Sequence, residues 1–218
     1  MKLKPRTDSP LLATAAAVVA SAASAADQSP VSELIANIKC PDDAVRGAAW
    51  QGAGKFGAPA VKPLAGLMQD PEMETARSAK RALWKIVRHA GRPGAGAEQK
   101  AVVTELIPLL ANDHTPTRRE VLWMLSEIGG DEAVPAVAAL FSHPELREDA
   151  RAALERIHGN KSLAALKSAL AKAPEDYKPA IAVSLRARGV TVKGYPSQKL
   201  VPTKKTGLEP ATGSQKTL

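Results

Sequence analysis

Large aromatic side chains are scarce in this chain of 218 residues, where tryptophan, tyrosine and phenylalanine together make up 3%. A core with so few rings must be filled by aliphatic side chains and by small residues at close contacts between elements. Alanine is abundant instead, and it is the strongest helix former among the amino acids. The composition therefore favours an all-α fold before any pattern is considered.

Cysteine occurs only once, at position 40, which excludes an intramolecular disulfide and any metal site built from several cysteines. Cys40 ends an apolar segment, and we interpret it as a small hydrophobe. The alternative is a thiol that pairs with another chain. None of the four histidines is followed one, three or four residues later by glutamate or a second histidine. We therefore expect no metal ion.

Catalytic motifs are also missing from the sequence. It contains no nucleophile elbow, no phosphate-binding glycine-rich loop and no haem-attachment motif. The glycines between positions 91 and 98 follow a helical pattern rather than a strand, so this segment is predicted to be a connecting loop. We expect the protein to catalyse no reaction and to need neither a cofactor nor a small-molecule substrate.

Residues 1–25 have the order of a secretory signal peptide. Three basic residues come first, an apolar run over 11–20 follows, and 23–25 read as an A-x-A cleavage site. The run is shorter than the roughly 20 residues of a membrane span. We predict export to the periplasm or the cell exterior, with no membrane span after cleavage. An uncleaved anchor and an alanine-rich tail are the alternatives.

The net charge of +8 comes mostly from the two ends of the chain. Residues 1–25 carry three bases and one acid, which gives +2, and residues 191–218 carry five lysines and one acid, which gives +4. The segment 26–190 keeps only the remaining +2. A nucleic-acid partner requires a basic footprint on the folded body. The high net charge is therefore only weak evidence for such a partner.

One helical pattern recurs five times along the chain. In each copy a central apolar residue has an apolar or alanine residue four positions earlier, and in the first four copies another apolar residue three positions later. Spacings of three and four place these side chains on one face of a helix. The fifth copy has Arg188 at the last position. The central residues are Ala53, Leu83, Leu125, Leu154 and Leu185, separated by steps of 30, 42, 29 and 31.

A second apolar helix pattern precedes each copy, so the chain is predicted to form about five stacked antiparallel helix pairs, an all-α solenoid. The long step of 42 reflects the insertion at 91–98. Prolines at 63, 108 and 135 should lie in the first turn of their helices or kink them. The repeat domain covers 26–190, and its repeats are predicted at 31–57, 58–90, 99–130, 131–159 and 160–190.

Three short stretches carry a family resemblance. The sequences VRGAA at 45–49, EIGG at 127–130 and AVPAV at 133–137 resemble HEAT repeats. The period of about 30 residues is similar to that of the short bilin-lyase-type HEAT-like subclass. The resemblance covers residues 31–190. It implies a helical-repeat fold and leaves the function open.

We predict a non-catalytic scaffold that binds a protein or peptide on the concave face of the solenoid. Two alternatives stay open: a lyase-like HEAT protein that handles a chromophore, and a nucleic-acid binder similar to HEAT-like alkylation-repair glycosylases. Export and the lack of a nucleophile argue against the first, and export argues against the second. HEAT-like hydroxylases hold iron with His-Glu pairs, and no such dipeptide occurs here.

The candidate binding residues lie on the second helix of each repeat. At 100° per residue, Trp84 and Trp123 fall at about 140° and 200° from the core position, so they point away from the core of their own repeat. Arginine and tryptophan are the residue types that binding hot spots prefer. The alternative is that each tryptophan packs against a neighbouring repeat. The predicted partner-binding residues are Arg77, Arg81, Trp84, Arg119, Trp123, Glu148 and Glu155.

Residues 191–218 lose the helical period and read as an extended basic tail. Tyr195, Leu200 and Val201 could anchor its first half on the last repeat, which otherwise exposes an apolar face. A free tail that docks on an acidic partner is the alternative up to Pro202, and beyond it we expect disorder.

Overall fold

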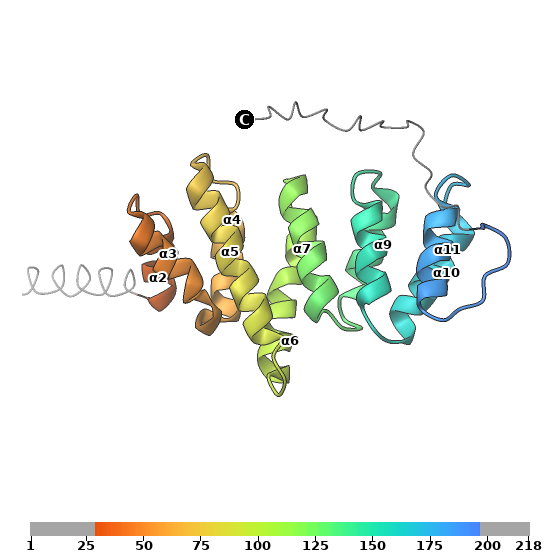
Figure 1. Ribbon diagram of the computed structural model, residues 1–218, viewed down its shortest axis with the longest axis horizontal. Helices are drawn as coiled ribbons and strands as arrows, with labels where there is room; N and C mark the ends of the chain where they lie inside the picture. The colour runs from red at the N-terminus through yellow and green to blue at the C-terminus, as the bar shows by residue number, and fades with distance from the viewer. Residues whose placement is uncertain (1–28, 197–218) are drawn as a thin grey trace, which may run out of the picture.

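The computed structural model describes residues 29–196 as a row of helix pairs (Figure 1). No strand occurs in this part of the chain, and the predicted all-α solenoid is confirmed. Each pair has a first and a second helix. The first helices are α2 (Pro30–Ile38), α4 (Val61–Leu67), α6 (Gly96–Leu106), α8 (Val134–Ala139) and α10 (Asn160–Lys172). The second helices are α3 (Asp43–Gln51), α5 (Met73–Ala90), α7 (Thr115–Ile128), α9 (Arg147–Arg156) and α11 (Lys178–Ala187).

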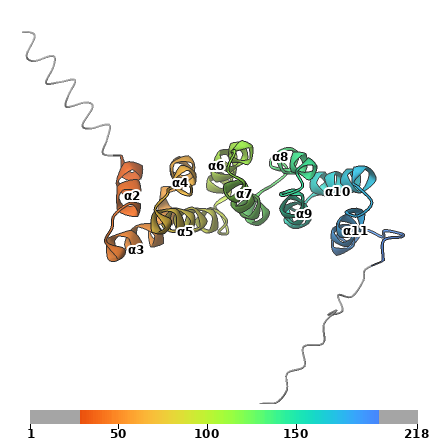
Figure 2. The same cartoon turned by 90° about the horizontal axis from the view of Figure 1, so that it is seen from above.

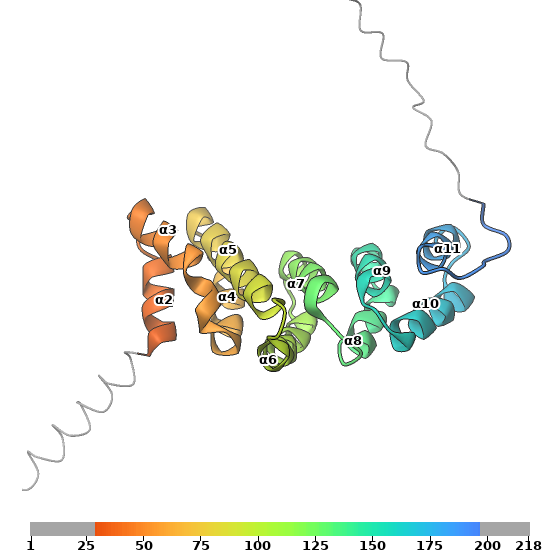
Figure 3. The same cartoon turned by 60° about the horizontal axis from the view of Figure 1, so that its bottom comes forward.

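The first and second helices form two layers, which Figure 2 shows from above and Figure 3 from an oblique angle. The row bends into a shallow arch, and the second helices lie on its inner side (Figure 2). Four short 3-10 segments complete or precede α-helices in the first four repeats. They are η1 (Ala53–Phe56), η2 (Ala58–Ala60), η3 (Ile107–Ala111) and η4 (Leu140–Ser142).

Helix starts are encoded by side chains that satisfy otherwise unpaired backbone N–H groups. The Asp42 carboxylate accepts from the N–H groups of Ala44 at 2.8 Å and Val45 at 2.9 Å, at the beginning of α3. The Glu72 carboxylate accepts in the same way from Glu74 and Thr75, at the beginning of α5. These caps favour the sharp turn between the two helices of a pair.

The three prolines of the first helices lie where a missing N–H costs little. Pro63 and Pro135 occupy the first turns of α4 and α8. Pro108 is the second residue of η3, where α6 changes to a 3-10 helix. The ring of Pro108 cannot continue the α-helical hydrogen bonding, and the backbone tightens there.

The predicted loop over 91–98 is wrong for its second half. The turn covers only 91–95, with Gly94 at a φ of 84°, and α6 begins at Gly96. The long step between repeats comes instead from longer helices: α5 runs on to Ala90, with Val87 and Ala90 buried in the core, and α6 with η3 (96–111) is longer than α8 with η4 (134–142). The turn between α5 and α6 consequently projects beyond its neighbours (Figure 1).

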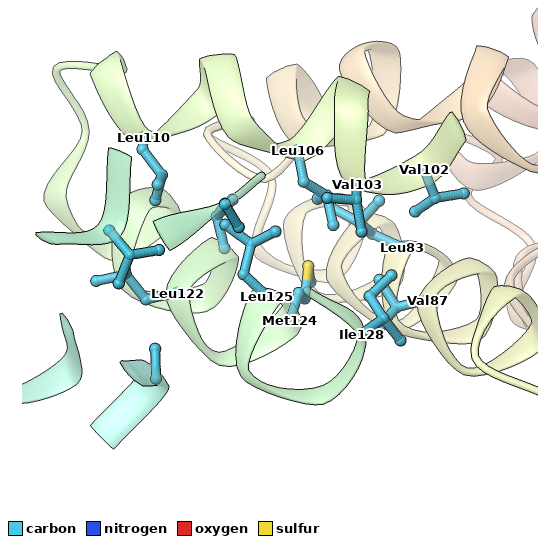
Figure 4. Close-up of a cluster of buried hydrophobic side chains, with 14 of the residues drawn as sticks. Leu83, Val87, Val102, Val103, Leu106, Leu110, Leu122, Met124, Leu125 and Ile128 are labelled. Atoms are coloured by element: carbon cyan, nitrogen blue, oxygen red, sulfur yellow. The ribbon is translucent and has the colours of Figure 1, made fainter. Parts of the chain in front are cut away.

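A continuous hydrophobic core runs between the two layers. The central residues of the five repeats are all buried, with at most 1% of their surface exposed. Figure 4 shows the middle of this core, where Leu83 and Val87 of α5, Leu106 of α6 and Leu125 and Ile128 of α7 pack together. Burial of these aliphatic groups is the main stabilising term of the fold, about 1.5–3 kcal/mol for each large side chain.

The segment after α11 is anchored on the last repeat as far as the structure describes it. Val192 packs against the hydrophobic core, and the Arg186 guanidinium donates to the carbonyl oxygens of Val192 at 3.1 Å and Gly194 at 2.6 Å. These contacts hold the segment on the last repeat as far as Gly194. The rest of the predicted tail, 197–218, lies outside the described residues.

The predicted signal peptide at 1–25 also lies outside the described residues. None of the helices between residues 29 and 196 is both long and apolar enough to cross a membrane. Cys40 is half-buried and lies just after the end of α2.

Candidate functional site

The candidate site lies on the side of the second helices that is turned away from the hydrophobic core, which is the inner side of the arch. We call this side the second-helix face. All seven predicted residues lie on α5, α7 and α9, the central second helices of the arch. Within the described residues, four large hydrophobic side chains are exposed, and every one belongs to a second helix. They are Val45 with 40% of its surface exposed, Met73 with 58%, Trp123 with 41% and Val183 with 45%.

The two predicted tryptophans, Trp84 and Trp123, each contact the next repeat, and the two contacts are of the same kind. Trp84 Nε1 donates to Glu120 Oε2 at 3.0 Å, and the Lys80 ammonium lies 3.1 Å from Glu120 Oε1. Lys80 and Trp84 are four residues apart and so share one side of α5. Glu120 belongs to α7. We call this arrangement, a cation and an indole on one carboxylate, an inter-repeat clamp.

The second clamp joins α7 to α9 in the same manner. Trp123 Nε1 donates to Asp149 Oδ1 at 3.1 Å, and Arg119 Nε donates to Asp149 Oδ2 at 2.9 Å. Arg119 also donates to the carbonyl oxygen of Glu145 at 2.9 Å. The indole N–H of Trp123 and the guanidinium of Arg119 therefore both donate to groups within the protein. The part of Trp123 that remains exposed to solvent belongs to its ring.

The clamp partners are residues that sequence reasoning missed. Lys80, Glu120 and Asp149 were not among the predicted site residues. The available signal was a cation four residues before each tryptophan, followed by an acidic residue on the second helix of the next repeat. The clamps show that Trp84 and Trp123 pack against a neighbouring repeat, as the alternative interpretation stated, while Trp123 also stays exposed.

Three cations on α5 lie over aromatic rings. Arg81 and Lys85 lie 5.5 and 5.8 Å from the ring centre of Trp50 in the first repeat. Arg88 lies 5.2 Å from the ring centre of Trp84. We call Arg81, Lys85 and Arg88 the basic ridge. All three side chains are exposed, and none forms an ion pair with another described residue.

Arg77, the remaining predicted cation of α5, is paired with Glu74, whose carboxylate lies 2.8 Å from its guanidinium. The structure therefore divides the predicted basic residues into two groups. Arg77 and Arg119 have carboxylate partners, whereas Arg81 has none within residues 29–196.

The two predicted acidic residues converge on Arg151. The Arg151 guanidinium pairs with Glu155 at 2.9 Å and with Glu148, and the Tyr177 hydroxyl donates to Glu148 Oε2 at 2.9 Å. The hydrogen bond from Arg151 lowers the pKa of Glu148, and the bond from Tyr177 adds to this. Burial raises the pKa of the Tyr177 phenol, with a further contribution from Glu148. Both predicted acidic residues are thus paired with an arginine of their own helix.

A cleft of about 650 Å³ opens between repeats four and five. Its walls are mostly apolar and include Phe141, Ala169 and Tyr177. Arg147 lies in the wall but is stacked 4.4 Å from the centre of the Tyr177 ring. No group of three or more His, Cys, Asp or Glu side chains within residues 29–196 is placed to hold a metal ion.

Comparison with known protein families finds a match over part of the chain. Residues 103–186 match the family of HEAT repeats. This match begins within α6 and extends into α11, so it covers the second half of the array. No curated protein matches the chain.

Several solved structures are similar to the chain at low identity. One engineered protein is 20% identical, with a TM-score of 0.39, and the match covers 73% of this chain and 79% of that one. A computationally designed armadillo repeat protein for modular peptide recognition is 19% identical, with a TM-score of 0.42 and coverage of 72% and 81%. A designed armadillo repeat protein in complex with the peptide (KR)4 is 16% identical, with a TM-score of 0.38 and coverage of 74% and 88%.

Proposed function

We propose that this protein is a non-catalytic scaffold that binds a protein or peptide partner along the second-helix face. The observation that carries the proposal is the distribution of exposed large hydrophobic side chains. All four of those in the described chain lie on second helices. Large apolar side chains that are exposed on only one of the two helix layers make that layer the candidate interaction surface. The HEAT-repeat match over 103–186 is in keeping with this use of a solenoid.

The shape of the molecule supports the same proposal. The second helices line the inner side of the arch, so a bound segment would contact several repeats at once (Figure 2). Trp123 lies near the centre of this face and keeps an exposed ring, while its N–H is already bonded to Asp149. A partner that covers the indole ring would gain apolar contact without having to satisfy a buried polar group.

Charge placed on the second-helix face tests this function. The double variant Met73→Glu and Val183→Glu adds two carboxylates at exposed positions on α5 and α11. Its matched control, Ala101→Glu and Ala164→Glu, adds the same charge at exposed positions on α6 and α10. In quantitative affinity capture from the cell envelope, we expect a partner retained by wild type and by the control but lost with the face variant. Equal recovery with both variants, or no partner with wild type, would contradict the proposal.

We further propose that the protein is exported and that its repeats are of the short bilin-lyase-type HEAT-like subclass. The support for export is the basic, apolar and small-residue order of residues 1–25. The support for the subclass is the period of about 30 residues. Mass spectrometry of protein from the extracytoplasmic fraction should give an N-terminus at Ala26. A chain that keeps Met1 and stays inside the cell would contradict export.

A further inference from the structure

We propose that the partner presents an acidic polypeptide segment, and that its carboxylates bind the basic ridge of Arg81, Lys85 and Arg88. This inference rests on the proposed function, because it assigns a chemistry to the partner of the second-helix face. It goes further by naming α5 as the helix that selects the partner. The exposed ring of Trp123 on the adjacent helix then receives an apolar residue next to the acidic stretch.

The first argument is the charge of α5. The helix carries five lysine and arginine residues and a single carboxylate, Glu74, which gives a net charge of +4. Two of the cations have partners, because Arg77 pairs with Glu74 and Lys80 pairs with Glu120 of α7. The three cations of the basic ridge remain without a carboxylate among the described residues. Their repulsion is relieved when an anion binds between them.

The second argument is the way in which the ridge is held. Arg81 and Lys85 lie over the Trp50 ring, and Arg88 lies over the Trp84 ring. A ring beneath a cation favours an extended side chain that lies along the surface, so less conformational freedom is lost when a carboxylate binds. The spacing of four and three residues keeps all three cations on one side of α5.

The third argument is the length of the ridge. Seven residues of helix separate its ends, or about 10 Å. An extended peptide covers that distance with about three residues. The next second helix lies about 8–10 Å away, so about three further residues would reach Trp123. A short acidic stretch followed by an apolar residue therefore matches the second-helix face.

A nucleic acid matches this face less well, because the positive charge is confined to one helix. The next two second helices carry no net charge, with two bases and two acids on α7 and three of each on α9. A nucleic-acid strand has a phosphate at every nucleotide and needs cations along its whole path. Here that path would run across the carboxylate of Glu127, which lies exposed on α7.

Fluorescence anisotropy with defined probes tests the inference. The probe is a fluorescein-labelled peptide with four successive glutamates, a serine spacer and two leucines. The comparison probes are the same peptide with glutamines in place of glutamates and a labelled single-stranded oligothymidylate of equal charge. Wild type should bind the glutamate peptide more tightly than either comparison probe, and added salt should weaken that binding.

Matched variants locate the binding. The ridge variant is Arg81→Gln, Lys85→Gln and Arg88→Gln. Its control, Lys62→Gln, Lys100→Gln and Lys167→Gln, removes the same charge from exposed positions on the first helices α4, α6 and α10. We expect the ridge variant to bind the glutamate peptide about tenfold more weakly, the effect of three exposed charge pairs. The control should bind within about twofold of wild type, because exposed charges on the other layer are screened by salt. Circular dichroism confirms that both variants are folded.

The inference would be overturned if wild type did not bind the glutamate peptide, or bound the glutamine peptide equally well. Tighter binding of the oligothymidylate would also overturn it. So would an equal loss of affinity for the glutamate peptide in the ridge variant and its control. The capture experiment separates this failure from that of the proposed function. A partner that is lost with the Met73 and Val183 variant but retained by the ridge variant would leave the scaffold function intact and remove the acidic segment. Absence of any partner for wild type would remove the proposed function itself.

Discussion

Glu120 and Asp149 each accept hydrogen bonds from a cation and from an indole that lie four residues apart on the preceding second helix. Such a carboxylate fixes the distance between two repeats more tightly than a simple ion pair, because the indole N–H adds a directional bond. Both carboxylates are only partly exposed, with 27% and 16% of the side-chain surface accessible. Each clamp therefore contributes more than an ordinary surface ion pair does.

We predict that Glu120→Gln lowers the free energy of unfolding by about 1 kcal/mol, since the variant loses the ion pair with Lys80 and weakens the bond from Trp84. Glu127→Gln is the control on the same helix, because Glu127 is exposed and forms no ion pair with a described residue. It should change stability by less than about 0.5 kcal/mol. Urea unfolding followed by circular dichroism measures both values. Equal losses would show that the clamp has no special role.

Glu148 links stability to pH at the residue scale. Its pKa is lowered in the folded protein by Arg151 first and by Tyr177 next, so the charged form stabilises the fold above the ordinary pKa of 4.5. That contribution is lost as the pH falls below 4.5 through the lowered folded pKa. Because 58% of the Glu148 side chain is accessible, we expect it to be worth less than about 1 kcal/mol.

In pH-dependent unfolding, the stability difference between wild type and Glu148→Gln should therefore be present at neutral pH and shrink as the pH falls below 4.5. Glu105→Gln, at an exposed position on α6, serves as the control and should show no such change. A difference for Glu148→Gln that stays constant from neutral to acid pH would contradict the proposed linkage.

At the scale of elements, Arg188, which follows α11, caps the C-terminal end of α9. Four repeats have an apolar residue at this position, and the fifth has an arginine whose Nη1 donates to the carbonyl oxygens of Leu154 at 3.1 Å, Glu155 at 3.2 Å and Ile157 at 2.8 Å. Its Nη2 donates to Gly159 at 3.1 Å. The first three carbonyls lie at the end of α9, where a positive charge also meets the negative end of the helix dipole.

Replacement of Arg188 by methionine should therefore destabilise the contact between α9 and α11. We expect a loss of about 2 kcal/mol, because several partly buried carbonyl groups lose their donor at once. Arg156→Met is the control, since Arg156 is exposed at the same end of α9. It should cost less than about 0.5 kcal/mol. Thermal unfolding of the two variants measures the difference, and similar midpoints would show that solvent satisfies these carbonyls equally well.

At the scale of the whole molecule, the main contacts between described elements run within repeats and between adjacent repeats. Stability in such an array is approximately a sum over repeats and over the interfaces between neighbours. Leu125 lies in the central repeat and Leu185 in the last described one, and both are buried. The same substitution should therefore have different consequences at the two positions.

We predict that Leu125→Ala costs about 3 kcal/mol and raises amide exchange on both sides of the central repeat. Leu185→Ala should raise exchange in α10 and α11 but leave α3 and α5 unchanged, because the effect of a terminal repeat decays along the array. Hydrogen–deuterium exchange by mass spectrometry resolves the two patterns. A uniform rise in exchange for both variants would mean that the solenoid unfolds as a single cooperative unit.

The local part of this architecture could be predicted from the sequence alone. The helix pairs and their central buried residues follow from apolar spacings of three and four, which act within one or two turns of a helix. The loop predicted over 91–98 extended too far, because Gly96 obscured the start of α6, whose buried residues begin only at Val102. Helical periodicity also placed Trp123 on the outward side correctly.

Only the tertiary structure decided which of the candidate residues remain available. Trp84 meets Glu120, Trp123 meets Asp149, and Arg151 neutralises the two acidic candidates. The two indole contacts join residues 26 and 36 positions apart, and they depend on how far each second helix is shifted along its neighbour. That shift is set by packing across the whole interface between repeats, which the periodicity of a single helix does not contain.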